Sequence, residues 1–228
     1  MKVLALETAT STGSIAILDD RDGLVAETRV NITIAHSERL MSTVQWLLQA
    51  SQVTMDDLDA FAVSIGPGSF TGLRIGLSTV KGFCYATGRP LVPVPTLDAF
   101  SRVLSFCGHQ ICPMFDAKKN EVYTGLYRWE KGSMKKIMPE VSIQPDDLFR
   151  RITEPTVFLG EGARVYEKLI RDRLREHALF APPSKMSPAA STVAEIAVEK
   201  IRSGDYADPV SLTPLYIRKS EAELRWKK

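Results

Sequence analysis

The chain has few of the residues on which disulfide frameworks and metal centres are built. Its 228 residues include three cysteines and three histidines. An odd number of cysteines without regular spacing fits a reducing compartment rather than a disulfide framework. Cys107 and Cys112 form no CxxC pair and have only His109 near them in the sequence, so we expect no zinc site.

Strong net charge and long apolar runs are missing as well. The formal net charge of +2 gives no strong attraction to nucleic acid or to membranes. No stretch reaches the roughly 18 apolar residues of a membrane span, and Glu7 interrupts the apolar start before it could form a signal peptide. The apolar content of 44% still suffices for one or two lobes with sizeable cores. We therefore expect a soluble, cytoplasmic protein.

A glycine-rich turn in the first half of the chain connects a strand to a long helix. An apolar run ending at Val63 predicts a buried strand, and Gly66-Pro67-Gly68 ends it. Ser69 is a good N-cap for a helix that runs to about Thr87, where Gly88 stops it. Such a turn at a helix N-terminus can hold an anion, although its spacing matches neither the Rossmann motif nor the P-loop. The alternative is a tight strand-to-helix turn.

The helix after this turn has an unusual composition. Gly72, Gly76 and Gly82 lie inside it, and each costs about 1 kcal/mol relative to alanine. Close approach of another backbone is the usual reason for such glycines. Apolar and small residues also cover an arc of roughly 200° around the helix, whereas a helix facing only its own core needs about 100°. The helix is therefore either buried on two sides or reserves one side for a partner, and its periodicity favours neither.

The order of the predicted elements repeats once along the chain. Strands over 3–6, 14–18 and 24–30 are followed by a helix that opens at His36, which we expect to be a cap or an interface residue and not a metal ligand. With the strand and helix around the glycine-rich turn, the order is βββαβα, half of the duplicated fold of actin, Hsp70 and hexokinase. The order restarts at Ile111 in shortened form. We expect an N-terminal lobe over 1–108, a shortened C-terminal lobe over 109–213, and a tail over 214–228 that packs back on the first lobe.

An acidic residue and hydroxyls in the first hairpin loop stand where such folds place their first phosphate loop. The candidate nucleotide-binding residues are Glu7, Thr8, Gly66, Gly68 and Asp116. Polar hairpin loops are common, so an ordinary loop is the alternative.

Several motifs carry a family likeness over most of the chain. The segment 66–76 resembles the signature of the TsaB (YeaZ) family, as do 36–40, 116–117 before 121–123, and 214–218. The resemblance implies a two-lobed actin-like (ASKHA) fold and a role in forming threonylcarbamoyladenosine (t6A) next to the anticodon of tRNAs that read ANN codons. It also implies binding to the catalytic relative TsaD, a TsaE-like ATPase in the wider complex, and contact with tRNA only through that complex.

One comparison with the catalytic relative bears on chemistry. TsaD-like proteins carry an HxxxH pair after the glycine-rich helix, and its two imidazoles bind a metal. The matching positions of this chain hold Thr96 and Phe100, and its histidines have no paired spacing. We therefore expect no metal and no metal chemistry.

These observations favour a non-catalytic partner subunit that binds and organises a TsaD-like protein, and that forms a weak homodimer when alone. The expected partner-interface residues are His36, Leu40, Met41, Val44, Gly72, Ile75, Gly76, Thr79 and Phe83. The alternative is a nucleotide-binding protein with weak ATPase or GTPase activity, in which ATP or ADP binds with low affinity or at the complex interface. The sequence shows no Ser/His/Asp arrangement and no metal-binding arrangement typical of a peptidase.

Overall fold

The computed structural model describes residues 1–31 and 36–218, and the side chains of residues 36–38 lie outside that description. The chain forms two compact units, and each contains one five-stranded sheet. The first unit comprises Met1–Ala99 and Pro188–Leu215, and the second comprises Phe100–Ser187 and the residues from Tyr216 onward. Across the described ranges, no helix is long and apolar enough to span a membrane.

The sheet of the first unit is mixed, with strand order β3-β2-β1-β4-β5. Its strands are β1 (Lys2–Glu7), β2 (Thr12–Asp19), β3 (Gly23–Asn31), β4 (Ala60–Ser64) and β5 (Leu91–Val94). β1, β2 and β3 form an antiparallel meander, whereas β4 and β5 run parallel to β1. The register pairs Leu6 with Val63, so the ends of β1 and β4 lie side by side.

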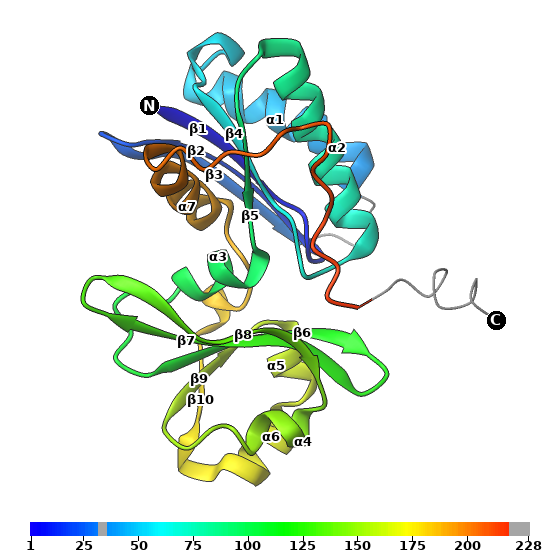
Figure 1. Ribbon diagram of the computed structural model, residues 1–228, viewed down its shortest axis with the longest axis vertical. Coiled ribbons are helices and arrows are strands. Elements are labelled where there is room, and N and C mark those ends of the chain that lie inside the picture. The colour runs from blue at the N-terminus through cyan, green and yellow to red at the C-terminus, as the bar shows by residue number, and fades with distance from the viewer. Residues whose placement is uncertain (32–35, 219–228) are drawn as a thin grey trace, which may run out of the picture. The chain divides into compact units, whose positions relative to one another are not determined.

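Helices cover both faces of this sheet (Figure 1). Leu4 and Leu6 point to the face covered by α1 (His36–Ser51) and α2 (Phe70–Thr87), while Val3 and Ala5 point to the face covered by α7 (Ala190–Arg202). Because both faces are buried, β1 is a continuous apolar run and not an alternating one. The short 3-10 turn η1 (Met55–Asp57) precedes β4.

The second unit repeats the same topology. Its strand order, read as β8-β7-β6-β9-β10, corresponds strand by strand to β3-β2-β1-β4-β5 of the first sheet. Its strands are β6 (Gln110–Lys118), β7 (Glu121–Glu130), β8 (Ser133–Ile143), β9 (Thr156–Leu159) and β10 (Ala178–Phe180), and its helices are α4 (Pro145–Phe149), α5 (Glu161–Val165) and α6 (Glu167–Leu174), with the 3-10 turns η2 (Arg175–His177) and η3 (Pro183–Lys185). The helix α4 has 5 residues where its counterpart α1 has 16, so this repeat is shortened, as predicted.

The division between the units differs from the predicted lobes. The chain passes from one unit to the other inside α3 (Thr96–Arg102), not near residue 108. α7, which we expected in the second lobe, belongs to the first unit, because Val193, Ala194 and Ala197 are buried against its sheet. The assignment of 109–213 to one lobe is therefore corrected.

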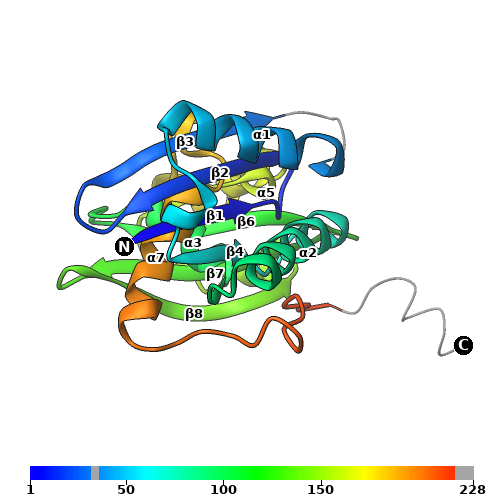
Figure 2. The ribbon, with the colours of Figure 1, turned by 90° about the horizontal axis from the view of Figure 1, so that it is seen from above.

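After α7 the chain crosses the first unit past β5 (Figure 1) and then runs beside α2 (Figure 2). Ala207 donates its backbone N–H to the carbonyl of Leu91 at 3.0 Å, and Leu215 donates to the carbonyl of Ile65 at 2.7 Å. Lys81 on α2 donates to the carbonyl of Val210 between these two points. The tail expected over 214–228 thus contacts the first unit at Leu215, whereas residues 219–228 lie outside the described residues.

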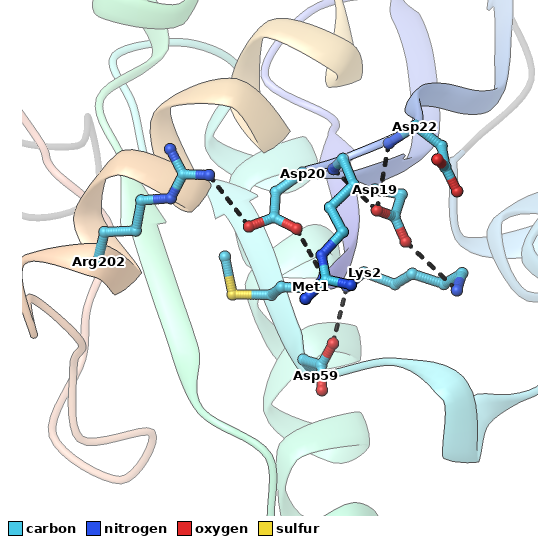
Figure 3. Close-up of polar contacts among 8 residues, drawn as sticks. Met1, Lys2, Asp19, Asp20, Asp22, Asp59 and Arg202 are labelled. Carbon is cyan, nitrogen blue, oxygen red and sulfur yellow. Dashed lines mark hydrogen bonds and ion pairs between the residues drawn. The ribbon is translucent and has the colours of Figure 1, made fainter.

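A cluster of charged groups joins the β1–β2 hairpin to α7 in the first unit (Figure 3). The carboxylate of Asp20 accepts from the amino group of Met1 at 2.7 Å and from Arg202 at 3.1 Å. Asp59 accepts the backbone N–H of Lys2 at 2.8 Å. Since Arg202 lies in the last turn of α7, these contacts fix the end of that helix to the hairpin.

Candidate functional site

The glycine-rich turn leads into α2 as the sequence predicts. Ser69 is the N-cap, and its hydroxyl accepts the backbone N–H of Gly72 at 3.2 Å. At the other end Gly88 adopts a left-handed φ of 70° and donates its N–H to the carbonyl of Cys84. Glycine is favoured there because this conformation is costly for residues with a Cβ. The predicted bounds of the helix are confirmed.

The loop after β1 packs directly on the first turns of α2. The hydroxyl of Thr8 donates to the carbonyl of Gly72 at 2.8 Å, and the backbone N–H of Ser69 donates to the carbonyl of Ala9 at 2.7 Å. A Cβ on Gly72 or Gly76 would collide with Thr8. These two glycines therefore allow close approach of the chain's own loop.

Glu7 lies at the base of this loop and is fully buried. Its carboxylate accepts the hydroxyl of Ser64 on β4 and the backbone N–H of Ala9, the latter at 2.6 Å. Both donors are neutral. Burial raises the pKa of Glu7 to about 7, while the two hydrogen bonds act in the opposite direction. The side chain ties the end of β1 to β4 and to the loop.

The candidate nucleotide-binding residues of the first unit serve this packing. Gly66 donates its N–H to the hydroxyl of Thr96 at 3.0 Å and accepts the backbone N–H of Thr96 at 2.8 Å. A Cβ on Gly68 would collide with Ala9. Glu7 and Thr8 are buried and hydrogen-bonded.

The positions that match the metal-binding pair of the catalytic relative have other contacts. Thr96 holds the Gly66 turn through the two hydrogen bonds above. Phe100 is buried and stacks on Phe115 with ring centroids 5.4 Å apart and an angle of 4° between the planes. Among the described side chains, those of residues 1–31 and 39–218, no group of three or more His, Cys, Asp or Glu is arranged to hold a metal ion.

Asp116, the remaining candidate, lies at the end of β6 in the second unit. It accepts the backbone N–H of Lys118 at 2.8 Å and its ammonium group at 2.7 Å. Burial favours the neutral acid, but the hydrogen bonds and charge of Lys118 outweigh it and lower the pKa of Asp116. The pKa of Glu161 is raised, mainly because burial removes water from its carboxyl group and also because the negative charge of Asp116 lies nearby. Asp116 is thus an ionised, paired carboxylate.

An apolar groove lies on the helical face of the first unit. It has a volume of about 710 Å³ and is formed by α1, the segment that follows it through η1, and Phe83 on α2. Its apolar lining comprises Met41, Val44, Leu48, Val53, Met55 and Phe83. None of the described lining residues is charged. Charge-depleted apolar surface of this kind is typical of the centre of a protein interface.

The structure divides the expected partner-interface residues into two groups. Met41, Ile75, Thr79 and Phe83 are exposed or half-buried, and Met41 and Phe83 line the groove. Leu40, Val44, Gly72 and Gly76 are buried. Val44 packs in the core cluster but also lines the groove, so it stays a predicted interface residue. Leu40 packs in the same core cluster and the two glycines face Thr8, so these three contact the chain's own core. The side chain of His36 lies outside the described residues.

Sequence reasoning missed three apolar residues of this surface. Leu48 on α1, Val53 after it and Met55 in η1 also line the groove. The apolar stripe along α1 includes Leu48, but it does not show that this residue lies at the open edge of the helix. Met55 carries no signal of its own, because its position depends on how η1 packs beneath α1.

Comparison with known proteins agrees with the architecture. A family model described as TsaD, tRNA N6-adenosine threonylcarbamoyltransferase, matches residues 28–226. The tRNA threonylcarbamoyladenosine biosynthesis protein TsaB of Bacillus subtilis (strain 168) is 31% identical over 99% of this chain and 98% of its own length. The solved structure of YeaZ from Pseudomonas aeruginosa is 26% identical, with a TM-score of 0.78 over 94% of this chain and 100% of that one.

A more distant structure shows the fold alone. Component A of the (R)-2-hydroxyglutaryl-CoA dehydratase of Acidaminococcus fermentans has a TM-score of 0.51 at 12% identity, over 89% of this chain and 99% of that one. The duplicated topology and these neighbours define an α/β protein of the actin-like (ASKHA) class. Within that class, the chain belongs to the TsaB (YeaZ) family, whose Bacillus member is named as a t6A biosynthesis protein.

Proposed function

We propose that this chain is a non-catalytic partner subunit in t6A biosynthesis. It binds a TsaD-like catalytic protein and organises it for threonylcarbamoyl transfer to adenosine 37 of tRNAs that read ANN codons. A TsaE-like ATPase joins the wider complex, and tRNA is reached through the catalytic subunit. Membership of the TsaB family and the match to the TsaD family model support this pathway.

The observation that carries the proposal is the apolar groove between α1 and α2. Met41 exposes 54% of its surface beside it, and Phe83 on α2 is half-buried. A standard interface buries about 800 Å² per partner and is depleted of charge at its centre. The groove, with the half-buried Ile75 and Thr79 on the same helix, supplies such a centre. A second copy of the chain would use the same surface, so the homodimer competes with the heteromeric complex.

The contacts described above give less support to the nucleotide-binding alternative. The carboxylate of Glu7 already accepts hydrogen bonds from Ser64 and Ala9. The N–H of Ser69 at the start of α2 already donates to the carbonyl of Ala9. Isothermal titration of the isolated chain with ATP and ADP tests this alternative, and tight binding would favour it.

A matched pair of substitutions on α2 tests the partner role. Phe83→Asp places a charge in the groove, whereas Tyr85→Asp places one on a side chain that is 95% exposed and does not line the groove. We expect Phe83→Asp to weaken binding of the TsaD-like protein at least a hundredfold, because an unpaired charge at an interface centre is costly. Tyr85→Asp should bind as the natural chain does.

Titration calorimetry of the complex, followed by reconstituted t6A formation with ATP, threonine, bicarbonate and tRNA, provides the measurement. Circular dichroism of each variant confirms that it is folded. Full binding by Phe83→Asp would contradict the proposal. Loss of product with intact binding would instead indicate a chemical role for this chain.

A further inference from the structure

Two methionines line the apolar groove of the first unit. Met41 comes from α1 and Met55 from η1, and both line the groove together with Phe83. The chain contains seven methionines. Met41 is the exposed one, whereas the other six are buried or half-buried. Since oxidation of a thioether depends on access of the oxidant, Met41 is the methionine of this chain that is most open to an oxidant.

The surroundings of Met41 make the product of oxidation consequential. Methionine is flexible and polarisable, so it adapts an apolar wall to a docking surface. The sulfoxide carries a strongly polar S=O group on the same side chain. Among the described residues that line the groove, none carries a charge that could offset this polarity.

We propose that Met41 is a reversible oxidation site and that its sulfoxide weakens docking in the groove. The oxidant is a hydroperoxide. The sulfur lone pair attacks the outer peroxide oxygen, the S–O bond forms and the O–O bond breaks. The remaining oxygen leaves as water or an alcohol after proton transfer. Sulfur loses two electrons and the peroxide gains them. A methionine sulfoxide reductase reverses the change at the expense of a thiol reductant.

The size of the effect follows from desolvation. A sulfoxide oxygen left without a donor in a closed interface loses its hydrogen bonds to water. We expect oxidised protein to bind an apolar partner surface about tenfold or more weakly. The identity of that partner as a TsaD-like protein rests on the proposed function, but the oxidation site does not.

The experiment treats the full chain with limiting hydrogen peroxide and measures three quantities. Peptide mass spectrometry gives the fraction of sulfoxide at each methionine. Fluorescence of 1-anilinonaphthalene-8-sulfonate reports the affinity of the groove for an apolar probe. Calorimetry gives the affinity for the TsaD-like protein. Met41→Leu keeps an apolar side chain without sulfur, and Met134→Leu removes a half-buried methionine from the second unit as a control.

We expect sulfoxide to form first at Met41 and to weaken probe and partner binding in the natural chain and in Met134→Leu. Treatment should not change the affinity of Met41→Leu, whatever its affinity before treatment, and reductase should restore the natural chain. Preferential oxidation elsewhere, or unchanged probe binding after complete oxidation of Met41, would overturn the proposal. If the untreated chain fails to bind the TsaD-like protein, the proposed function fails, while probe binding still decides the role of Met41.

Discussion

At the scale of single residues, Glu7 has a structural role that cannot be predicted from its position in the sequence. An acidic residue in the first hairpin loop is where a phosphate-binding group is expected in this fold. Here the carboxylate is buried and bonded to Ser64 and Ala9, with neutral donors only. An ionised carboxylate is poorly solvated in such a place, and this raises its pKa to about 7.

This environment predicts a pH-dependent stability. The folded chain keeps the Glu7 proton up to about pH 7, whereas the unfolded chain releases it near the ordinary value of 4.5. The free energy of unfolding therefore falls as pH rises between these values and stays lower above them. Glu7→Gln removes this dependence. At pH 8 the variant should be more stable than the natural chain by about 3 kcal/mol, and at pH 4.5 the two should be alike.

Urea unfolding at pH 4.5, 6 and 8, followed by circular dichroism, measures the difference. Glu7→Ala serves as the contrast, because it leaves the N–H of Ala9 without its partner and should be less stable at every pH. Parallel pH profiles for the natural chain and Glu7→Gln would show that folding does not raise the pKa of Glu7. Glu7→Gln is also the better variant for assays of t6A formation, since Glu7→Ala confounds chemistry with folding.

At the scale of elements, α2 contains glycines that serve different neighbours. Gly76 meets the loop of β1, where a Cβ would collide with the Thr8 hydroxyl. Gly82 is exposed, and a Cβ there would meet nothing within 4 Å. The sequence showed that three glycines were costly to the helix, but not which of them the chain itself requires.

The contrast gives a paired prediction for the isolated protein. Gly76→Ala should destabilise it by about 1–3 kcal/mol, because the loop must shift. Gly82→Ala should stabilise it by about 0.5–1 kcal/mol, because alanine lowers the entropic cost of the helix at an open site. Thermal and urea unfolding of both variants measures the effect. A stabilising Gly76→Ala would mean that the loop contact with α2 is dispensable.

Local patterns explain which elements could be predicted and which could not. The bounds of α2 follow from Ser69 and Gly88, whose capping roles are set by neighbouring residues. The contact between Thr8 and Gly72 spans 64 positions of sequence, and no local pattern encodes it. For the same reason, the sequence pattern predicts a partner surface at Gly72 and Gly76, whereas both glycines face Thr8 of the chain's own loop. β10 has only three residues and carries no alternation that would reveal it.

At the scale of the whole molecule, the first unit is built from both ends of the chain. Residues 188–215 return to it after Phe100–Ser187 of the second unit, and α7 covers one face of its sheet. The apolar stripe of α7 shows that the helix packs on something. It does not identify the sheet, because either repeat offers a suitable face. This is why the predicted lobes divided at the wrong place.

Removal of the returning segment should therefore unfold the first unit. A chain that ends at Ser187 leaves Val3, Ala5 and Val92 uncovered, and we expect it to aggregate or to lose its near-ultraviolet circular dichroism. A synthetic peptide of residues 188–215 added in trans should restore the folded state. Size-exclusion chromatography with and without the peptide makes the comparison. A monomeric, folded truncation would show that α7 is dispensable to the core.

The late return of α7 also has a consequence during synthesis. β5 ends at Val94, and α7 begins only at Ala190. At about 5–20 residues per second, the ribosome needs roughly 5–20 s to make the intervening chain. During that time one face of the nascent sheet has no cover. That face is lined mainly by alanine and valine, as at Val3, Ala5 and Ala62. Small side chains expose less apolar area than leucine or phenylalanine, so the waiting sheet offers less surface for aggregation on the ribosome.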